Sequence, residues 1–84
     1  MRITKEQFAR IEPYFPKQGG NVKIENYTFI NAVLYVAENE CKWAALPKKY
    51  GYWPAIYRRY HRWVKNGTMK RILSVMQQEK IINS

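Results

Sequence analysis

The sequence predicts an all-α fold, a small bundle of four to five short helices that forms a single domain over residues 1–84. Three observations favour this fold class. The chain has 84 residues, of which 46% are hydrophobic, and this suits one domain with a small core. Apolar residues recur at intervals of three and four, the period of helices with one buried face. Capping residues, prolines and glycines stand where these periodic segments begin and end.

The first helix is expected to begin at Lys5. Thr4 and Gln7 fit a capping box, in which the threonine hydroxyl accepts a backbone N–H and the glutamine side chain reaches back to the cap. Pro13 is expected to end this helix, because proline lacks the N–H that the next turn needs. The polar stretch 17–21 that follows is expected to be a loop.

The central part of the chain predicts a second helix and a short third segment. Asn26 is a candidate cap, and the helix is expected to run to about Asn39 with a buried stripe formed by Ile30, Val33, Leu34 and Ala37. The segment Lys42–Tyr50 is short and is interrupted by Pro47, which is tolerated only in a first turn or at a break between turns. Gly51 then permits a left-handed turn.

The next helix is expected to begin at Trp53, with Pro54 well placed in its first turn. Its apolar stripe comprises Trp53, Ile56, Tyr57, Tyr60, Trp63 and Val64. The opposite face comprises Ala55, Arg58, Arg59, Arg62 and Lys65. The sequence therefore predicts a helix with aromatic residues inward and cationic residues outward.

A last helix is expected after a turn at Asn66 and Gly67, with Thr68 as its cap. Its core face is expected to contain Met69, Ile72, Leu73 and Met76. Residues 81–84 are expected to trail off without structure.

The charge of the chain is strongly positive and concentrated in its second half. Lys and Arg number 15 against six acidic residues, which gives a net charge of +9, and none of the acids is Asp. Residues 43–84 carry nine basic residues and one acid, Glu79, and no acid stands between Glu40 and Glu79. Such a stretch predicts a surface that binds a polyanion. The plainer interpretation, a solvated cationic surface, is weakened because no acids compensate the charge.

A short helix, a glycine turn and a second helix with cations outward are typical of a helix-turn-helix, whose second helix enters the major groove of DNA. Arg58, Arg59 and Arg62 are the candidate contacts of that helix, because arginine pairs with guanine or holds phosphates. Flanking contacts to the DNA backbone are expected from Lys48, Lys49, Lys65, Lys70 and Arg71. Tyr52 is the aromatic residue least expected in the core and is a further candidate.

Other chemistry is not expected from this chain. His61 has no carboxylate near it in the sequence, and Cys41 is the one cysteine, so neither a disulfide nor a Cys/His zinc site has enough partners. We therefore expect no enzymatic activity, no metal and no cofactor. No apolar run approaches the roughly 20 residues of a membrane span, and residues 1–15 carry charges, so a cytoplasmic protein without a membrane partner is expected.

Several ordered blocks of the sequence also resemble the N-terminal domain of bacterial insertion-sequence transposases of family five. The motifs are N-A-x-L-Y-V, C-x-W-x-x-L-P and G-x-W-x-x-I-Y-R-R-Y-x-R-W, and the blocks lie at Thr4 to Pro16, Asn31 to Val36, Cys41 to Pro47, and Tyr50 to Trp63. The resemblance implies a helix-turn-helix that binds the terminal inverted repeats of the element. In the family this domain precedes an RNase-H-like catalytic domain with an Asp-Asp-Glu metal triad.

The chain departs from the family pattern in two ways. Ala44 stands where members commonly carry Arg or another polar residue, and no Asp is present for a metal triad. The sequence thus predicts a domain without strand-transfer chemistry: an isolated DNA-binding domain, the product of a truncated or frame-split element, or a small protein that kept the domain for another purpose. Expected partners are double-stranded DNA and either a second copy or a separately encoded catalytic domain. The alternative is a protein-interaction or inhibitor module whose basic face binds an acidic partner.

Overall fold

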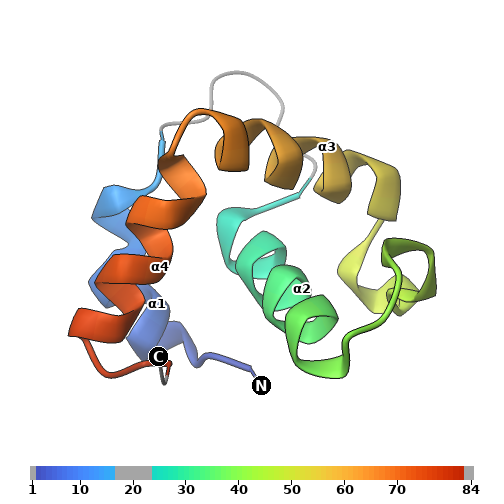
Figure 1. Ribbon diagram of the computed structural model, residues 1–84. Coiled ribbons are helices and arrows are strands. Elements are labelled where there is room, and N and C mark those ends of the chain that lie inside the picture. Colours follow the sequence, from blue (N-terminus) through green and yellow to red (C-terminus); the bar gives the residue numbers. More distant parts are fainter. Residues whose placement is uncertain (1, 17–23, 83–84) are drawn as a thin grey trace.

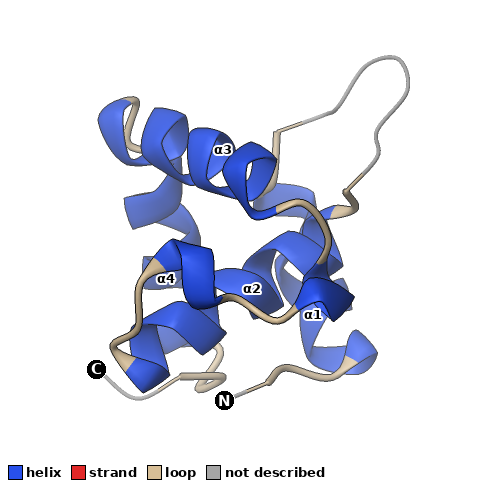
Figure 2. Cartoon of the chain, turned by 90° about the vertical axis from the view of Figure 1, so that its right-hand side faces the viewer, coloured by secondary structure: helices blue, strands red, loops and turns tan. Residues whose placement is uncertain are grey.

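The helix α3 (Trp53–Lys65) crosses the other helices, and α4 (Thr68–Gln78) turns back from its end to lie beside α1 (Lys5–Ile11) (Figure 1). The remaining α-helix, α2 (Asn26–Asn39), packs beneath α3 (Figure 2). This computed structural model describes residues 2–16 and 24–82. Every regular element within those ranges is helical, which confirms the all-α prediction.

The capping box predicted at the start of α1 is confirmed. The Gln7 backbone N–H donates to Thr4 Oγ1 at 3.1 Å, and the Thr4 N–H donates to Gln7 Oε1 at 2.9 Å. The α-helix ends before Pro13, as expected, and a single 3₁₀ turn, η1 (Glu12–Tyr14), continues it. The loop predicted at 17–21 lies outside the described residues.

The helix α2 has the predicted length but buries a different set of residues. Glu25, not Asn26, is its N-cap, and its side chain makes no capping hydrogen bond. Residues 29–34 are buried in succession, so the middle of α2 is enclosed on all sides, not along one stripe. Ala37 is exposed, so its predicted place in the core is wrong; it lies in the last turn, beyond the enclosed part of the helix.

Asn31 is a polar residue within this enclosed part of α2, with a side chain only 2% exposed. Its Oδ1 accepts the Ile3 backbone N–H at 2.9 Å, and its Nδ2 donates to the Tyr27 carbonyl at 3.2 Å. The Tyr27 hydroxyl in turn donates to the Ile3 carbonyl at 3.1 Å. These bonds satisfy the buried amide and attach the segment before α1 to α2.

The short helix expected before the glycine turn is not formed: two single 3₁₀ turns, η2 (Trp43–Ala45) and η3 (Lys48–Tyr50), lie between α2 and α3. Pro47 separates them, as its missing N–H requires. Gly51 then has φ +106°, a backbone conformation that residues with a Cβ rarely adopt. η2 contacts α3 and η3 contacts α2, so the segment packs against both helices.

The turn between α3 and α4 is made by Asn66 and Gly67, as predicted, with Gly67 at φ +83°. The prediction that Thr68 caps α4 is wrong: Thr68 is the first helical residue, and its backbone N–H donates to Asn66 Oδ1 at 2.9 Å. Ile81 also differs from expectation. It is buried, and its N–H donates to the Met76 carbonyl at 2.8 Å, so the chain folds back after α4.

The core is centred on aromatic rings from three parts of the chain. Trp63 of α3 is 3% exposed and meets the Phe29 ring of α2 at a centroid distance of 4.8 Å and the Phe15 ring at 5.9 Å, both edge to face. From α4 the predicted core residues Met69, Ile72 and Met76 are buried, and Leu73 is partly buried against them. The core therefore fixes α3 against α2 and α4.

Candidate nucleic-acid interface

The buried side of α3 is rotated from the predicted one. Ile56 and Trp63 are buried as expected, and Tyr60 packs partly against the core. Three residues assigned to the inner stripe are exposed by 36%, 40% and 50%, namely Trp53, Tyr57 and Val64. Their predicted burial is wrong, because the helix contacts its neighbours through Ile56, Tyr60 and Trp63 and turns the adjacent residues outward.

Arg59 lies on this inner side, so its predicted place on the outer face with Arg58 and Arg62 is also wrong. Its guanidinium carbon lies 5.1 Å from the Phe29 ring centroid and 5.8 Å from that of Trp63. Its Nη1 donates to Asn26 Oδ1 at 3.5 Å. Burial, and then the neighbouring charge of Arg62, lower the pKa of Arg59, although an arginine remains charged at neutral pH. Arg59 therefore joins α3 to α2.

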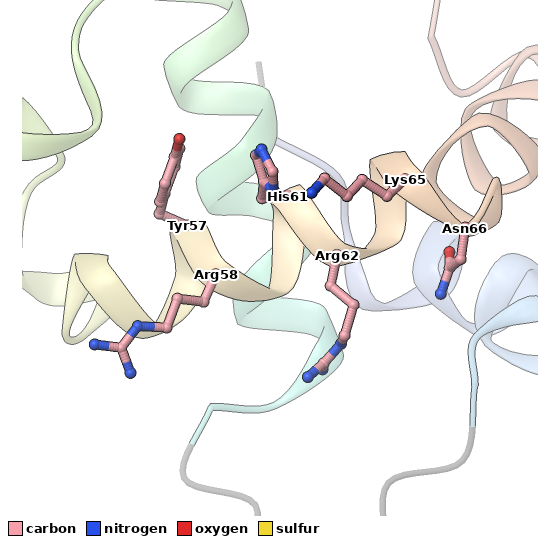
Figure 3. Close-up of a pocket in the computed structure, with 6 residues that line it drawn as sticks. All are labelled: Tyr57, Arg58, His61, Arg62, Lys65 and Asn66. Atoms are coloured by element: carbon pink, nitrogen blue, oxygen red, sulfur yellow. The ribbon is translucent and has the colours of Figure 1, made fainter.

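The outer side of α3 carries two rows of side chains (Figure 3). Arg58 and Arg62 point to one side of the helix, whereas Tyr57 and His61 point to the other. The Lys65 side chain extends back along the helix towards His61. Together with Asn66 these residues line a shallow hollow of about 540 Å³. The arrangement places cationic groups beside aromatic rings on one exposed surface, which we call the α3 outer face, comprising Trp53, Tyr57, Arg58, His61, Arg62 and Lys65.

The remaining predicted contacts come from the elements next to α3. Lys48 and Lys49 of η3 are exposed and line a hollow of about 340 Å³ with the start of α2. Lys70 and Arg71 of α4 are exposed too, and the Arg71 guanidinium carbon lies 5.9 Å from the Tyr14 ring centroid. Tyr52, at the N-cap of α3, is 69% exposed, as expected.

Tyr57 and Asn66 line the hollow but were not among the residues expected to form a site. The helical period of the apolar residues predicts Tyr57 in the core, because its aromatic ring suits the inner stripe. Its spacing of four residues from His61, and of eight from Lys65, places the three on one side of α3, but spacing alone does not tell whether that side is exposed. The Tyr57 and His61 rings contact each other, with a centroid distance of 5.9 Å.

Arg59→Ala is expected to lower the free energy of unfolding by about 1–2 kcal/mol, because it removes two cation–π contacts and the packing of a half-buried side chain. Arg58→Ala is the matched control. It removes an exposed arginine one residue away and is expected to change stability by less than about 0.5 kcal/mol. Urea denaturation of both variants measures the difference. Equal stability of the two would contradict the assignment of Arg59 to the inner side.

Neither a metal cluster nor a membrane helix is found in the described ranges. Residues 2–16 and 24–82 contain no group of three His, Cys, Asp or Glu side chains placed to hold a metal ion. No helix in that part of the chain combines the length and apolar character needed to cross a bilayer. Cys41 is a free, partly buried thiol.

Comparisons with known proteins give a family match and one relative. Residues 3–73 match the family model described as "Putative transposase of IS4/5 family (DUF4096)". The chain is similar to an uncharacterized protein, y4sN, of Sinorhizobium fredii, with 31% identity over 80 residues. That alignment covers 92% of this chain and 64% of the relative, so the chain spans less than two thirds of the relative's length. No solved structure matches the chain. The matched range runs from Ile3 through α3 and into α4.

Proposed function

Since the chain belongs to the IS4/5 transposase family, we propose that it is a DNA-binding domain that recognises a specific duplex sequence, such as the end of a transposable element, through α3. In this proposal α3 is the second helix of a helix-turn-helix and lies in the major groove. A groove about 12 Å wide accepts one α-helix. Strand transfer would come from a catalytic domain outside these 84 residues, which contain no Asp.

The cationic surface of α3 on a fixed helix is the observation that carries this proposal. Ile56 and Trp63 anchor one side of α3 in the core, while Arg58, Arg62 and Lys65 are exposed on the other. Their charge is not offset along the chain, because no acid occurs between Glu40 and Glu79. A helix that is held in place loses little conformational freedom when it binds, and its cations attract a polyanion before contact.

The flanking cations fit the roles that such a docking requires. Lys48 and Lys49 precede α3, Lys70 and Arg71 follow it, and all four are exposed, so we assign them to phosphates on either side of the groove. Phosphate contacts set the register of the protein on the duplex, whereas base contacts set specificity. We assign Arg58 and Arg62 as base readers and the flanking cations, with Lys65, as phosphate contacts.

Single alanine variants test this division. Arg58→Ala or Arg62→Ala is expected to cost about 1–3 kcal/mol of binding free energy on a selected site and much less on a scrambled duplex. Lys48→Ala or Lys70→Ala should weaken binding to both duplexes alike, because phosphates are the same in every sequence. Fluorescence anisotropy titrations on the two duplexes measure these changes.

Two results would count against the proposal. Uniform losses on both duplexes for Arg58→Ala and Arg62→Ala would mean that α3 only holds the backbone. Equal affinity for an acidic polypeptide and for DNA would favour the other function open to a basic surface, binding of an acidic protein.

A further inference from the structure

Aromatic rings follow one another along the α3 outer face from the first residue of the helix to His61. Trp53, Tyr57 and His61 are spaced by four residues, so they lie on one side of the helix. The Trp53 and Tyr57 ring centroids are 6.5 Å apart, and those of Tyr57 and His61 are 5.9 Å apart. Tyr52, the most exposed of the large hydrophobic residues described, stands next to Trp53. We call Trp53, Tyr57 and His61 the aromatic row.

The aromatic row packs against Trp43 on its inner side, but its outer side is exposed to solvent. Trp43 of η2, which is partly buried, meets the Tyr57 ring at 5.9 Å and the Tyr60 ring at 5.3 Å. Tyr57 is thereby held in place, yet it and Trp53 remain more than a third exposed. Rings of this size usually bury their surface, so an exposed and supported row indicates a ligand surface.

The row runs beside a row of cations. Arg58 and Arg62 point to the other side of the same helix, and Lys65 extends towards His61 (Figure 3). The shallow hollow lies among these side chains. A single strand of nucleic acid needs this combination of groups, because its bases stack on aromatic rings while its phosphates pair with cations.

We propose that the aromatic row binds unpaired bases of single-stranded DNA, with Trp53 and Tyr57 as the stacking surfaces and Lys65, which extends towards His61, on a phosphate. This inference rests on the proposed function and extends its substrate from a duplex to a duplex with an unpaired segment. A paired duplex offers base edges in its grooves but no free base faces, so the rings can stack only where pairing is interrupted.

A second copy of the chain does not fit this surface. Two copies joined through the α3 outer face would bring Arg58, Arg62 and Lys65 of each against the other, and the residues of this face include no acid to offset them. Like charges placed together across an interface oppose association. A ligand that is negatively charged and also presents flat π surfaces can stack on the aromatic row and pair with the row of cations.

The test compares two single strands that differ only in their bases. The parent chain is titrated with a deoxythymidine oligonucleotide and with an abasic oligonucleotide of the same length, so the phosphates are matched. We expect the thymidine strand to bind about 10-fold tighter or better, since one stacked base contributes about 5- to 160-fold. Equal affinity for the two strands would overturn the proposal.

Variants locate the effect. Trp53→Ala and Tyr57→Ala should each reduce the preference for the thymidine strand about 5-fold or more, with little change on the abasic strand. Tyr14→Ala is the matched control, because Tyr14 is a similarly exposed ring on η1 and should leave the preference unchanged. Urea denaturation establishes that each variant is folded. A preference that survives both row variants would overturn the proposal.

Two further ligands complete the test. A blunt duplex distinguishes failure of this inference from failure of the proposed function, and a uridine oligonucleotide distinguishes DNA from RNA as the ligand. If a blunt duplex binds but the thymidine strand shows no preference over the abasic one, this inference fails and the proposed function stands. If no DNA binds at all, both fail. A uridine oligonucleotide of the same length is the RNA control, and tighter binding to it than to the thymidine strand would overturn the assignment to DNA.

Discussion

Trp63→Ala is expected to lower the free energy of unfolding by about 3–5 kcal/mol, which in a domain of this size leaves much of the protein unfolded. The indole is buried and contacts Phe15, Phe29 and the Arg59 guanidinium, which belong to three separate parts of the chain. Its removal would leave a cavity where α3 meets α2. It would also leave Arg59 half-buried with one of its two aromatic contacts missing.

The adjacent residue supplies the control. Val64 is half exposed and is expected to tolerate replacement by Ala with a change of less than about 1 kcal/mol. Urea denaturation followed by circular dichroism compares both variants with the parent. A Trp63→Ala variant within about 1 kcal/mol of the parent would mean that Trp63 does not close the core.

Affinity for duplex DNA is expected to fall roughly 250- to 1,000-fold between about 50 and about 200 mM salt. This follows if about five phosphates are neutralised, because each releases counterions and the slope of log affinity against log salt is then near −4 to −5. The cations proposed to supply these contacts are the exposed ones assigned to phosphates, which are Lys48, Lys49, Lys65, Lys70 and Arg71.

DNA titrations over a range of salt concentrations measure the slope. Two variants that each lose one positive charge are compared with the parent. Lys65→Ala should reduce the magnitude of the slope by about one unit, since one phosphate contact is lost. Arg10→Ala removes an equal charge from α1, outside the predicted contacts, and should leave the slope nearly unchanged. A flat salt dependence of the parent would remove the basis for α3 as an electrostatic contact to DNA.

The ends of the helices could be predicted to within about one residue, because local chemistry determines them, although the caps expected at Asn26 and Thr68 are each one residue too late. The capping box at Thr4, the break at Pro47 and the glycines at 51 and 67 act within a few residues, whatever the rest of the chain does. The bounds of α2 and α3 were therefore close to those observed.

The orientation of α3 about its own axis could not be predicted in the same way. The sequence interpretation placed aromatic residues inward and arginines outward, but the side chains of both types are amphipathic. Arg59 packs its guanidinium over two rings, while the rings of Trp53 and Tyr57 face outward. Which of them is buried depends on where α2 and η2 lie, and those are contacts between distant parts of the chain.

The same limit applies to the candidate site. The charge pattern identified α3 as the cationic helix, and Arg58, Arg62 and Lys65 are exposed there as expected. Stacking of Trp53 and Tyr57 on bases is the second interpretation of their spacing, after burial in the core, because a Tyr or Trp at helical spacing is indistinguishable in sequence from a core residue. Only the position of Ile56 and Trp63 against the neighbouring helices turns the aromatic row outward.

The hydrogen bond from the Ile3 amide to Asn31 has a consequence for how the N-terminal end opens. Terminal segments usually exchange their amide hydrogens through local fraying that costs almost no free energy. Here, release of Ile3 would leave the buried side-chain oxygen of Asn31, Oδ1, without its hydrogen-bond donor. It would also expose the Ile3 side chain, which is fully buried in the core. Ile3 is therefore expected to open together with α2, and its amide hydrogen to exchange on the slow timescale of that cooperative unit.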